Sequence, residues 1–135
     1  MKEYKEIQVA LLGLGTVGLG VYKVLQMQKE EMQHKIGTEI KIKKILVRNL
    51  EKAAGKIEDA SVLTDSWQEI VNDDEIQIVI EVMGGMEPAR TYIMEAMQAG
   101  KQVVTANKDL IAADGKELMD QAKKSGCDLL FEAAV

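Results

Sequence analysis

Two hydrophobic patterns alternate along the whole chain. Runs rich in Ile, Val and Leu predict strands, and segments with apolar residues every three or four positions predict amphipathic helices. The first run, at residues 7–12, is apolar at nearly every position, which is typical of a strand buried on both faces. A helix is expected directly after it, at 16–34. The same patterns predict strands at 39–47, 61–63, 76–82, 102–105 and 128–131, and helices at 51–54, 67–72, 88–99 and 115–125.

Short polar signals mark several of the expected helix starts. Ser66 and Glu69 have the spacing of a capping box, and Asp114 and Glu117 have the same spacing ahead of the helix at 115–125. Pro88, the only proline, stands where the helix at 88–99 begins, as is typical of proline in a first helical turn.

Strands and helices therefore alternate from one end of the chain to the other. This order predicts an α/β fold with a parallel sheet that is covered by helices on both faces. Right-handed crossovers place six strands in the order 3-2-1-4-5-6, which is the doubly wound, three-layer α/β/α (Rossmann) architecture. We expect one domain over residues 1–135, because the sequence contains no linker, internal repeat or low-complexity segment.

Composition narrows the class of protein. The chain has 135 residues, of which 47% are hydrophobic and 29% charged, and its net charge is −5. These values are typical of a globular domain and disfavour a nucleic-acid binder. No apolar run is long enough for a membrane span, and the polar residues 1–6 are unlike a signal peptide. One Cys and one His disfavour an intrachain disulfide or a zinc site and favour a cytoplasmic location.

The loop between the first strand and the first helix carries the strongest functional signal. Its G-x-G-x-x-G pattern, with a strand before it and a helix after it, is the fingerprint of dinucleotide binding. Gly13 permits a tight turn, Gly15 lets a pyrophosphate approach the backbone, and Gly18 lets the helix pack close to the strand. The N–H groups at the start of the helix are the expected phosphate donors. The predicted binding loop consists of Gly13, Leu14, Gly15, Thr16, Val17 and Gly18.

The second strand indicates which dinucleotide is held. Proteins that prefer NAD place an acidic residue about 20 positions after the glycine loop. Glu39 has that spacing, but it begins the strand at 39–47, whereas the ribose lies beyond the strand's other end. Arg48 stands at that other end, and its guanidinium suits a phosphate. We therefore expect NADP, or tolerance of both NADP and NAD; the alternative is that Arg48 is an ordinary surface arginine.

Two further loops lie at the same edge of the expected sheet. Glu81 lies near the end of the otherwise apolar strand at 76–82, so its charge indicates either a place in the ligand crevice or a pairing with a lysine or a helix N-terminus. Gly84 comes shortly after it and suits close approach of a cofactor. Lys108 follows the strand at 102–105 and is a candidate contact for the nicotinamide ribose or a substrate oxygen, with an ordinary exposed lysine as the alternative.

Several segments together resemble homoserine dehydrogenase. They are VALLGLGTVG at 9–18, EVMGGMEPA at 81–89, VVTANKDLIA at 103–112 and FEAAV at 131–135. The resemblance implies an NAD(P)-dependent oxidoreductase that interconverts L-homoserine and L-aspartate 4-semialdehyde by hydride transfer. That reaction belongs to the branch of amino-acid synthesis leading to threonine, methionine and isoleucine. The resemblance also implies that this chain is the N-terminal cofactor domain of a longer protein.

The resemblance further implies roles for particular positions. Thr16, Val17 and Lys108 match cofactor-contacting residues of the family, and Arg48 stands where the family often has an arginine near the adenosine ribose. In the family, the catalytic Lys and Asp, most substrate ligands and the main homodimer contacts belong to a second domain.

The segment at the end of the chain matches a cation site of the family. Glu132 and Val135 stand at positions whose backbone oxygens bind a monovalent cation, usually sodium. The remaining ligands of that cation also belong to the second domain.

We expect this chain alone to bind NAD(P) but to turn over homoserine negligibly. Hydride transfer at an alcohol carbon needs a group that moves the hydroxyl proton, and Lys108 by itself is a weak candidate. Two other functions remain open at this point: the cofactor domain of a different Rossmann amino-acid dehydrogenase, and a stand-alone module that senses NAD(P).

Overall fold

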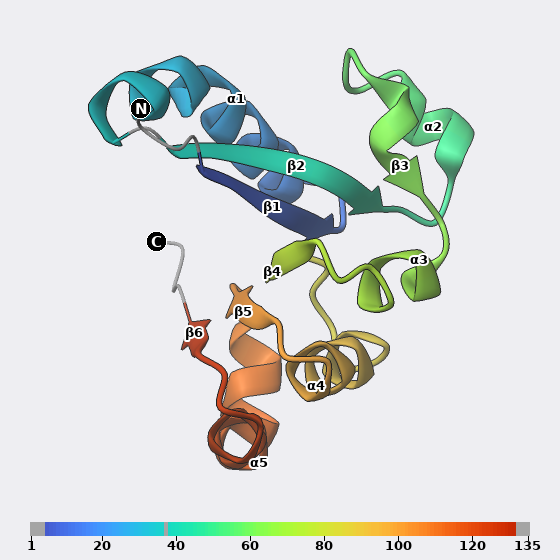
Figure 1. Cartoon of the computed structure of the whole chain (residues 1–135). Helices are drawn as coiled ribbons and strands as arrows, with labels where there is room; N and C mark the ends of the chain where they lie inside the picture. The colour runs from blue at the N-terminus through green and yellow to red at the C-terminus, as the bar shows by residue number, and fades with distance from the viewer. Residues whose placement is uncertain (1–4, 37, 132–135) are drawn as a thin grey trace.

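The computed structural model describes residues 5–36 and 38–131 of the chain. Within these residues, six strands form a parallel sheet in the order β3-β2-β1-β4-β5-β6, so the predicted strand order is confirmed (Figure 1). The strands are β1 (Lys5–Leu12), β2 (Thr38–Leu46), β3 (Leu63–Thr64), β4 (Ile76–Glu81), β5 (Gln102–Thr105) and β6 (Leu129–Phe131).

Helices connect the strands and complete three layers. Figure 1 shows α1 on one side of the sheet and α4 and α5 on the other, which confirms the doubly wound α/β/α architecture. The helices are α1 (Thr16–Ile36), α2 (Leu50–Ala54), α3 (Trp67–Val71), α4 (Ala89–Gln98) and α5 (Lys108–Ser125), with a short 3₁₀ helix η1 (Ala60–Val62) before β3. In the described part of the chain, no helix combines the length and apolar character that crossing a membrane requires.

The start of α5 corrects the sequence prediction. The helix expected at 115–125 begins seven residues earlier, at Lys108. The side chain of Asn107 accepts a hydrogen bond from the Leu110 N–H at 3.1 Å and caps the helix there. Asp114, the predicted cap, has non-helical backbone angles (φ −128°, ψ 16°) and marks a kink inside α5.

The region around β3 corrects two further details. Ser61 and Val62, expected in the edge strand at 61–63, belong to η1, and only Leu63 and Thr64 pair with β2. Ser66 is the N-cap residue of α3 but makes no side-chain capping bond. Instead, the Thr64 hydroxyl donates to Glu69 at 2.5 Å and accepts from the Ser66 N–H at 3.1 Å.

The face of the sheet under α4 and α5 is buried across four strands. Ala10, Val79, Val103 and Leu129 are neighbours in register on β1, β4, β5 and β6. Their exposed fractions are 0%, 0%, 1% and 7%, and all four belong to one hydrophobic core. The helices therefore cover this face as far as the edge strand.

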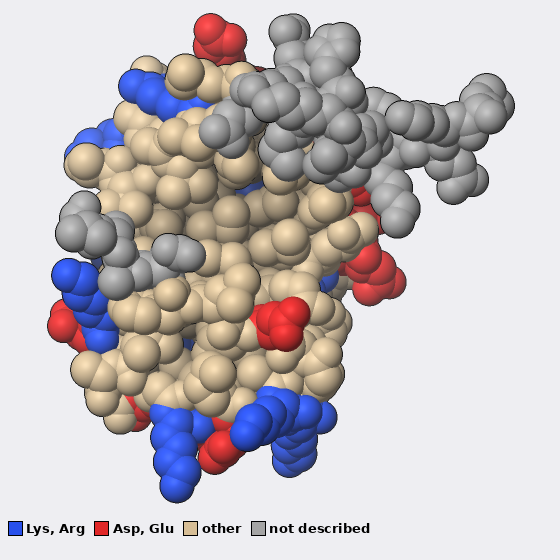
Figure 2. Space-filling view, turned by 90° about the vertical axis from the view of Figure 1, so that its left-hand side faces the viewer, with Lys and Arg blue, Asp and Glu red and all other residues tan. Residues whose placement is uncertain are grey.

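The opposite face is covered only where α1 lies. The next row in register is Leu11, Ile80, Val104 and Leu130. Leu11 is fully buried in the core that α1 shares, Ile80 and Val104 are partly buried, and Leu130 is 59% exposed. Figure 2, which views the molecule from the left of Figure 1, shows few charged side chains across the middle of the surface. Burial on this face thus decreases with distance from α1.

Candidate cofactor-binding site

The glycine loop lies between β1 and α1, at the carboxyl edge of the sheet. Gly13 has a φ of 105°, a left-handed conformation that favours glycine, and its N–H donates to the Leu46 carbonyl at 2.9 Å. A Cβ on Gly13 would lie 3.3 Å from the Met83 Cα, and a Cβ on Gly18 would lie 2.4 Å from the Gly13 carbonyl oxygen. The loop is therefore held between β2 and the segment after β4, and α1 packs directly against it.

The outer side of the loop is open. A Cβ on Gly15 would meet no heavy atom within 4 Å, and Gly15, Thr16 and Val17 are all exposed. The helical hydrogen bonds begin with the Leu19 N–H donating to the Gly15 carbonyl at 2.8 Å, so the first N–H groups of α1 have no partner in the helix. The first turn carries no acidic residue. This geometry fits an anion held by backbone N–H groups and the helix dipole.

A cleft of about 740 Å³ extends from the glycine loop across the ends of β2 and β4. Gly13, Leu14 and Gly15 line one part of it, and Arg48 and Asn49, just after β2, line another. The cleft crosses the place where the strand order reverses between β1 and β4, which is the position of ligand sites in doubly wound folds.

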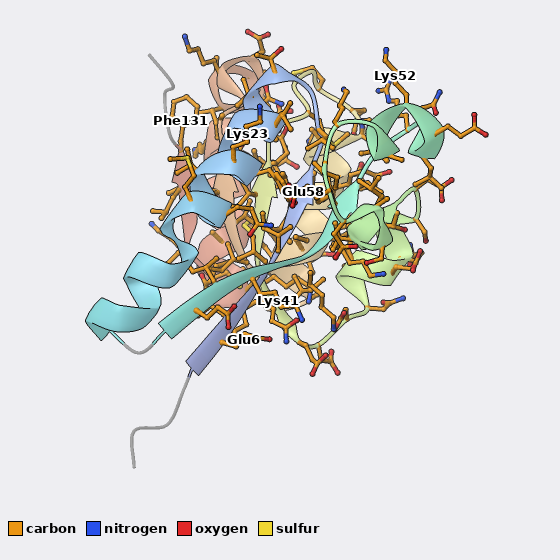
Figure 3. The ribbon with its side chains drawn as sticks, turned by 90° about the horizontal axis from the view of Figure 1, so that it is seen from above. Glu6, Lys23, Lys41, Lys52, Glu58 and Phe131 are labelled. Atoms are coloured by element: carbon orange, nitrogen blue, oxygen red, sulfur yellow. The ribbon has the colours of Figure 1, made fainter. Side chains whose placement is uncertain are left out.

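Three cationic side chains line the β2 end of the cleft. Arg48 is exposed, and Lys52 and Lys56 follow it at intervals of four residues. The Lys56 ammonium donates to the Leu14 carbonyl at 3.0 Å, which ties the turn after α2 to the glycine loop. Figure 3 shows Lys52 on α2, at the end of the molecule toward which β1 and β2 run. Asp65 also lines the cleft, so cations outnumber carboxylates there.

Glu81 is the last residue of β4 and is fully buried. One carboxylate oxygen accepts from the Thr105 hydroxyl at 2.5 Å, and the other accepts from the N–H groups of Met83 and Gly84 at 2.9 and 3.1 Å. The sequence left a lysine or a helix N-terminus as its alternative partner. The structure shows neither arrangement; a hydroxyl and loop amides bind the carboxylate instead.

Asn107 links the two loops that follow β4 and β5. Its side-chain amide donates to the Gly85 carbonyl at 2.6 Å, and its N–H donates to the Thr105 hydroxyl oxygen at 3.1 Å. Gly84 and Gly85 have φ values of 77° and 76°, so the first loop uses backbone conformations that favour glycine. The Glu81–Thr105–Asn107 network therefore fixes both loops at the carboxyl edge.

Comparison with known proteins identifies the family. The profile described as "Homoserine dehydrogenase, NAD binding domain" matches residues 13–132 of the chain. The chain belongs to the homoserine dehydrogenase family, as its NAD-binding domain. Homoserine dehydrogenase of Bacillus subtilis is 46% identical over 131 residues, which are 97% of this chain and 30% of that protein. The Lactococcus lactis enzyme is 45% identical over 96% of this chain and 31% of its own length.

Solved structures of homoserine dehydrogenases have the same fold. The S. aureus enzyme at pH 6.0 matches with a TM-score of 0.88 and 44% identity, over 95% of this chain and 33% of its own. The enzyme from Thiobacillus denitrificans matches with a TM-score of 0.87 and 46% identity, over 97% and 30%. A hyperthermophilic archaeal homoserine dehydrogenase in complex with NADPH matches with a TM-score of 0.75 and 25% identity, over 95% and 44%. The chain thus spans about a third of the length of the curated relatives that it matches.

The structure brings some of the predicted site residues of this homoserine dehydrogenase domain together in the cleft and leaves others beside it. Gly13, Leu14, Gly15 and Arg48 line the cleft. The predicted residues that do not line it are Thr16, Val17, Gly18, Gly84 and Lys108. Glu132 and Val135, expected to hold a monovalent cation, lie outside the described residues.

Two cationic residues of the cleft were not predicted from the sequence. The segment 50–59, which contains Lys52 and Lys56, has no clear hydrophobic period, but Arg48, Lys52 and Lys56 recur at intervals of four residues, which is a usable signal. Four-residue spacing places side chains on one face when the segment is helical, and α2 spans Leu50–Ala54.

Three ionisable groups with displaced pKa values lie around the start of β4 and do not line the cleft: Lys43, Asp73 and Lys101. Hydrogen bonding to Lys43 lowers the pKa of Asp73, and the two groups form an ion pair at 2.6 Å. Lys101 is buried, and its ammonium donates to the carbonyls of Asp73 and Ile76 at 2.6 and 2.8 Å. Burial lowers the pKa of Lys101. These groups stabilise the start of β4 and take no part in the cleft.

Proposed function

We propose that this chain holds NADP or NAD for an enzyme that interconverts L-homoserine and L-aspartate 4-semialdehyde. The observation that carries the proposal is the open glycine loop, continuous with Arg48 in one cleft of a homoserine dehydrogenase NAD-binding domain. The same proposal places the enzyme in the cytoplasm, in the synthesis of threonine, methionine and isoleucine. It also includes a homodimer and a sodium ion at Glu132 and Val135, both completed by polypeptide that this chain does not contain.

The glycine loop is proposed to hold the pyrophosphate. Gly15 leaves space for it, and the N–H groups of Thr16 and Val17 point from the start of α1, where the helix dipole favours an anion. Gly13 and Gly18 keep the loop close to β1 and the segment after β4, because a side chain at either position would meet backbone atoms.

Arg48 is proposed to hold the 2′-phosphate of NADP, with Lys52 beside it. The guanidinium can donate two parallel hydrogen bonds to a phosphate, and Lys52 adds a second positive charge in the same cleft. The archaeal relative that was solved with NADPH supports a phosphorylated cofactor in this family. NAD, which lacks that phosphate, would lose these contacts and keep those of the glycine loop.

Titration with both cofactors tests the assignment of Arg48. We expect Arg48→Ala to weaken NADP⁺ binding by about tenfold or more, the value of a charged hydrogen bond, and to change NAD⁺ binding by less than about twofold. Lys41→Ala is the matched control, because Lys41 is an exposed cation on β2 that does not line the cleft (Figure 3). Equal weakening of both cofactors by Arg48→Ala would contradict the assignment.

The bound cofactor supplies the hydride acceptor, and the rest of the reaction needs a group that accepts the hydroxyl proton. The candidate that the sequence offers is Lys108, which follows the loop after β5. It is exposed at the first position of α5 and does not line the cleft. We therefore propose that the chain alone binds the cofactor without efficient turnover. Homoserine-dependent reduction of NADP⁺ by this chain at about 1 s⁻¹ or faster, an ordinary enzyme rate, would refute this part of the proposal.

A further inference from the structure

The buried carboxylate of Glu81 has no cation beside it. It is 0% exposed, and no ion pair of the described residues involves it. Its three partners are the Thr105 hydroxyl and the N–H groups of Met83 and Gly84, all of them neutral. Burial of a carboxylate without a counter-ion costs folding free energy. A carboxylate that is buried in this way at a ligand-binding edge is therefore a candidate for a role in function.

Each oxygen of this carboxylate accepts at least one hydrogen bond. Thr105 Oγ1 already accepts from the Asn107 N–H at 3.1 Å, which leaves its own proton free to point at Glu81 Oε1. Glu81 Oε2 accepts from two backbone N–H groups. Both oxygens thus act as acceptors, which is the role of an ionised carboxylate. The negative charge is therefore fixed in place in a water-poor interior.

The position of Glu81 is central to the carboxyl edge. In register it lies between Leu12, the last residue before the glycine loop, and Thr105, at the end of β5. The Val82 N–H donates to the Leu12 carbonyl at 3.0 Å, so the loop after Glu81 begins against the glycine loop. The carboxylate consequently sits beneath the point where the loops of β1, β4 and β5 meet.

This position lies under the nicotinamide half of the proposed cofactor. The glycine loop marks the pyrophosphate, and Arg48 marks the adenosine end on the β2 side. A dinucleotide crosses the strand-order reversal between β1 and β4, so its other nucleotide extends over β4 and β5. The oxidised nicotinamide ring carries a positive charge, and the reduced ring carries none.

We propose that Glu81 supplies the counter-charge for the oxidised nicotinamide ring and so biases this domain toward the oxidised cofactor. The inference rests on the proposed binding of NAD(P) in this cleft. The carboxylate acts through space and needs no contact with the ring, because charges interact over several ångströms in a poorly screened interior. Its hydrogen bonds to the loops hold the charge in place.

Glu81→Gln tests the charge with little change of shape. The amide oxygen can accept from the Met83 and Gly84 N–H groups, and the amide nitrogen can donate to Thr105 Oγ1. We expect the ratio of the dissociation constants of NADP⁺ and NADPH to rise about three- to tenfold, as removal of one partly screened charge implies. NADPH affinity should change by less than about twofold.

Thr105→Val is the matched control, because it removes one hydrogen bond and keeps the carboxylate. It should leave the ratio within about twofold of the parent chain, even where both affinities fall. A parent chain that binds both cofactors while Glu81→Gln leaves the ratio unchanged would overturn the role of Glu81 alone. A parent chain that binds neither cofactor would overturn the proposed function itself.

A measurement on the parent chain keeps the inference testable if Glu81→Gln does not fold. The parent should bind NADP⁺ at least as tightly as NADPH. Preference of the parent for NADPH by about tenfold or more would overturn the inference, since a fixed negative charge near the ring opposes that preference.

Discussion

Gly18 is the position where one added methyl group should disturb the domain most. A Cβ there would lie 2.4 Å from the Gly13 carbonyl oxygen and 3.2 Å from the Val82 Cγ2 atom, whereas ordinary contacts begin at 3.4 Å. The Gly13 oxygen belongs to backbone and cannot rotate away. To accept Gly18→Ala, α1 must move outward from the glycine loop by about 1 Å, the difference between 3.4 and 2.4 Å.

Two opposing contributions set the change in the free energy of unfolding on Gly18→Ala. Overpacking against well-ordered backbone costs about 1–3 kcal/mol, and the severe overlap at Gly18 places the cost near the upper end. Replacing a helical glycine by alanine contributes about 1 kcal/mol in the other direction. Gly20→Ala isolates the difference, because Gly20 lies in the same helix and its Cβ would meet nothing within 4 Å. We expect Gly20→Ala to stabilise the chain and Gly18→Ala to destabilise it, with a gap of about 3 kcal/mol.

Urea denaturation followed by circular dichroism measures the gap directly. For a domain of this size it corresponds to a difference of roughly 10 °C in Tm. NADP⁺ affinity should fall about tenfold or more in Gly18→Ala, because the N–H groups of Thr16 and Val17 move with the helix, and should stay unchanged in Gly20→Ala. Equal stability of the two variants would refute the packing argument. Lost stability with unchanged affinity would refute the link between the helix position and the phosphate site.

Two further predictions concern parts of the fold away from the cleft. Leu129→Ala should lower the free energy of unfolding by about 2–4 kcal/mol, and Leu130→Ala should lower it by less than about 0.5 kcal/mol. The reason is that the two side chains lie on opposite faces of β6 and are 7% and 59% exposed. Similar urea midpoints for the two variants would contradict the conclusion that the face of Leu130 is uncovered. Asp73 has a pKa lowered from its ordinary 3.8 by Lys43, so its contribution to stability is complete above that value and is lost as the pH falls through the folded value. Asp73→Asn should therefore flatten the acid-side fall of unfolding free energy below about pH 4, and a fall as steep as the parent's would count against the ion pair.

The sheet was predictable because its signal is repeated. Each strand is a short apolar run flanked by polar turns. Right-handed crossovers then restrict the order in which six such strands can lie in a sheet. Helix starts were less predictable, because Asn and Asp are equally good caps. Asn107 and Asp114 both stand before helical sequence, and the structure uses Asn107 as the cap and Asp114 as a kink. Only the backbone geometry distinguishes the two.

The candidate site shows the same division between local and distant information. The glycine loop is encoded within six residues, so the sequence alone predicted its turn at Gly13 and its close packing at Gly18. The partners of Glu81 lie in the loop after β4 and on β5, and Thr105 is 24 positions away. A hydrogen bond of that kind depends on which strands are neighbours and on their register, and neither is visible in a local sequence motif.

The β2 end of the cleft shows how charge spacing carries functional information that hydrophobic pattern does not. The three cations belong to different elements: Arg48 follows β2, Lys52 lies in the five-residue helix α2, and Lys56 lies in the turn after it. They converge because Asn49 caps α2 immediately after the strand, with its side chain accepting from the Lys52 N–H at 3.0 Å. That cap sets where α2 begins, and Lys52 lines the same cleft as Arg48. Recognition of a 2′-phosphate would therefore depend on Asn49 as well as on the cations, since without the cap α2 would begin elsewhere and Lys52 would lose its place in the cleft.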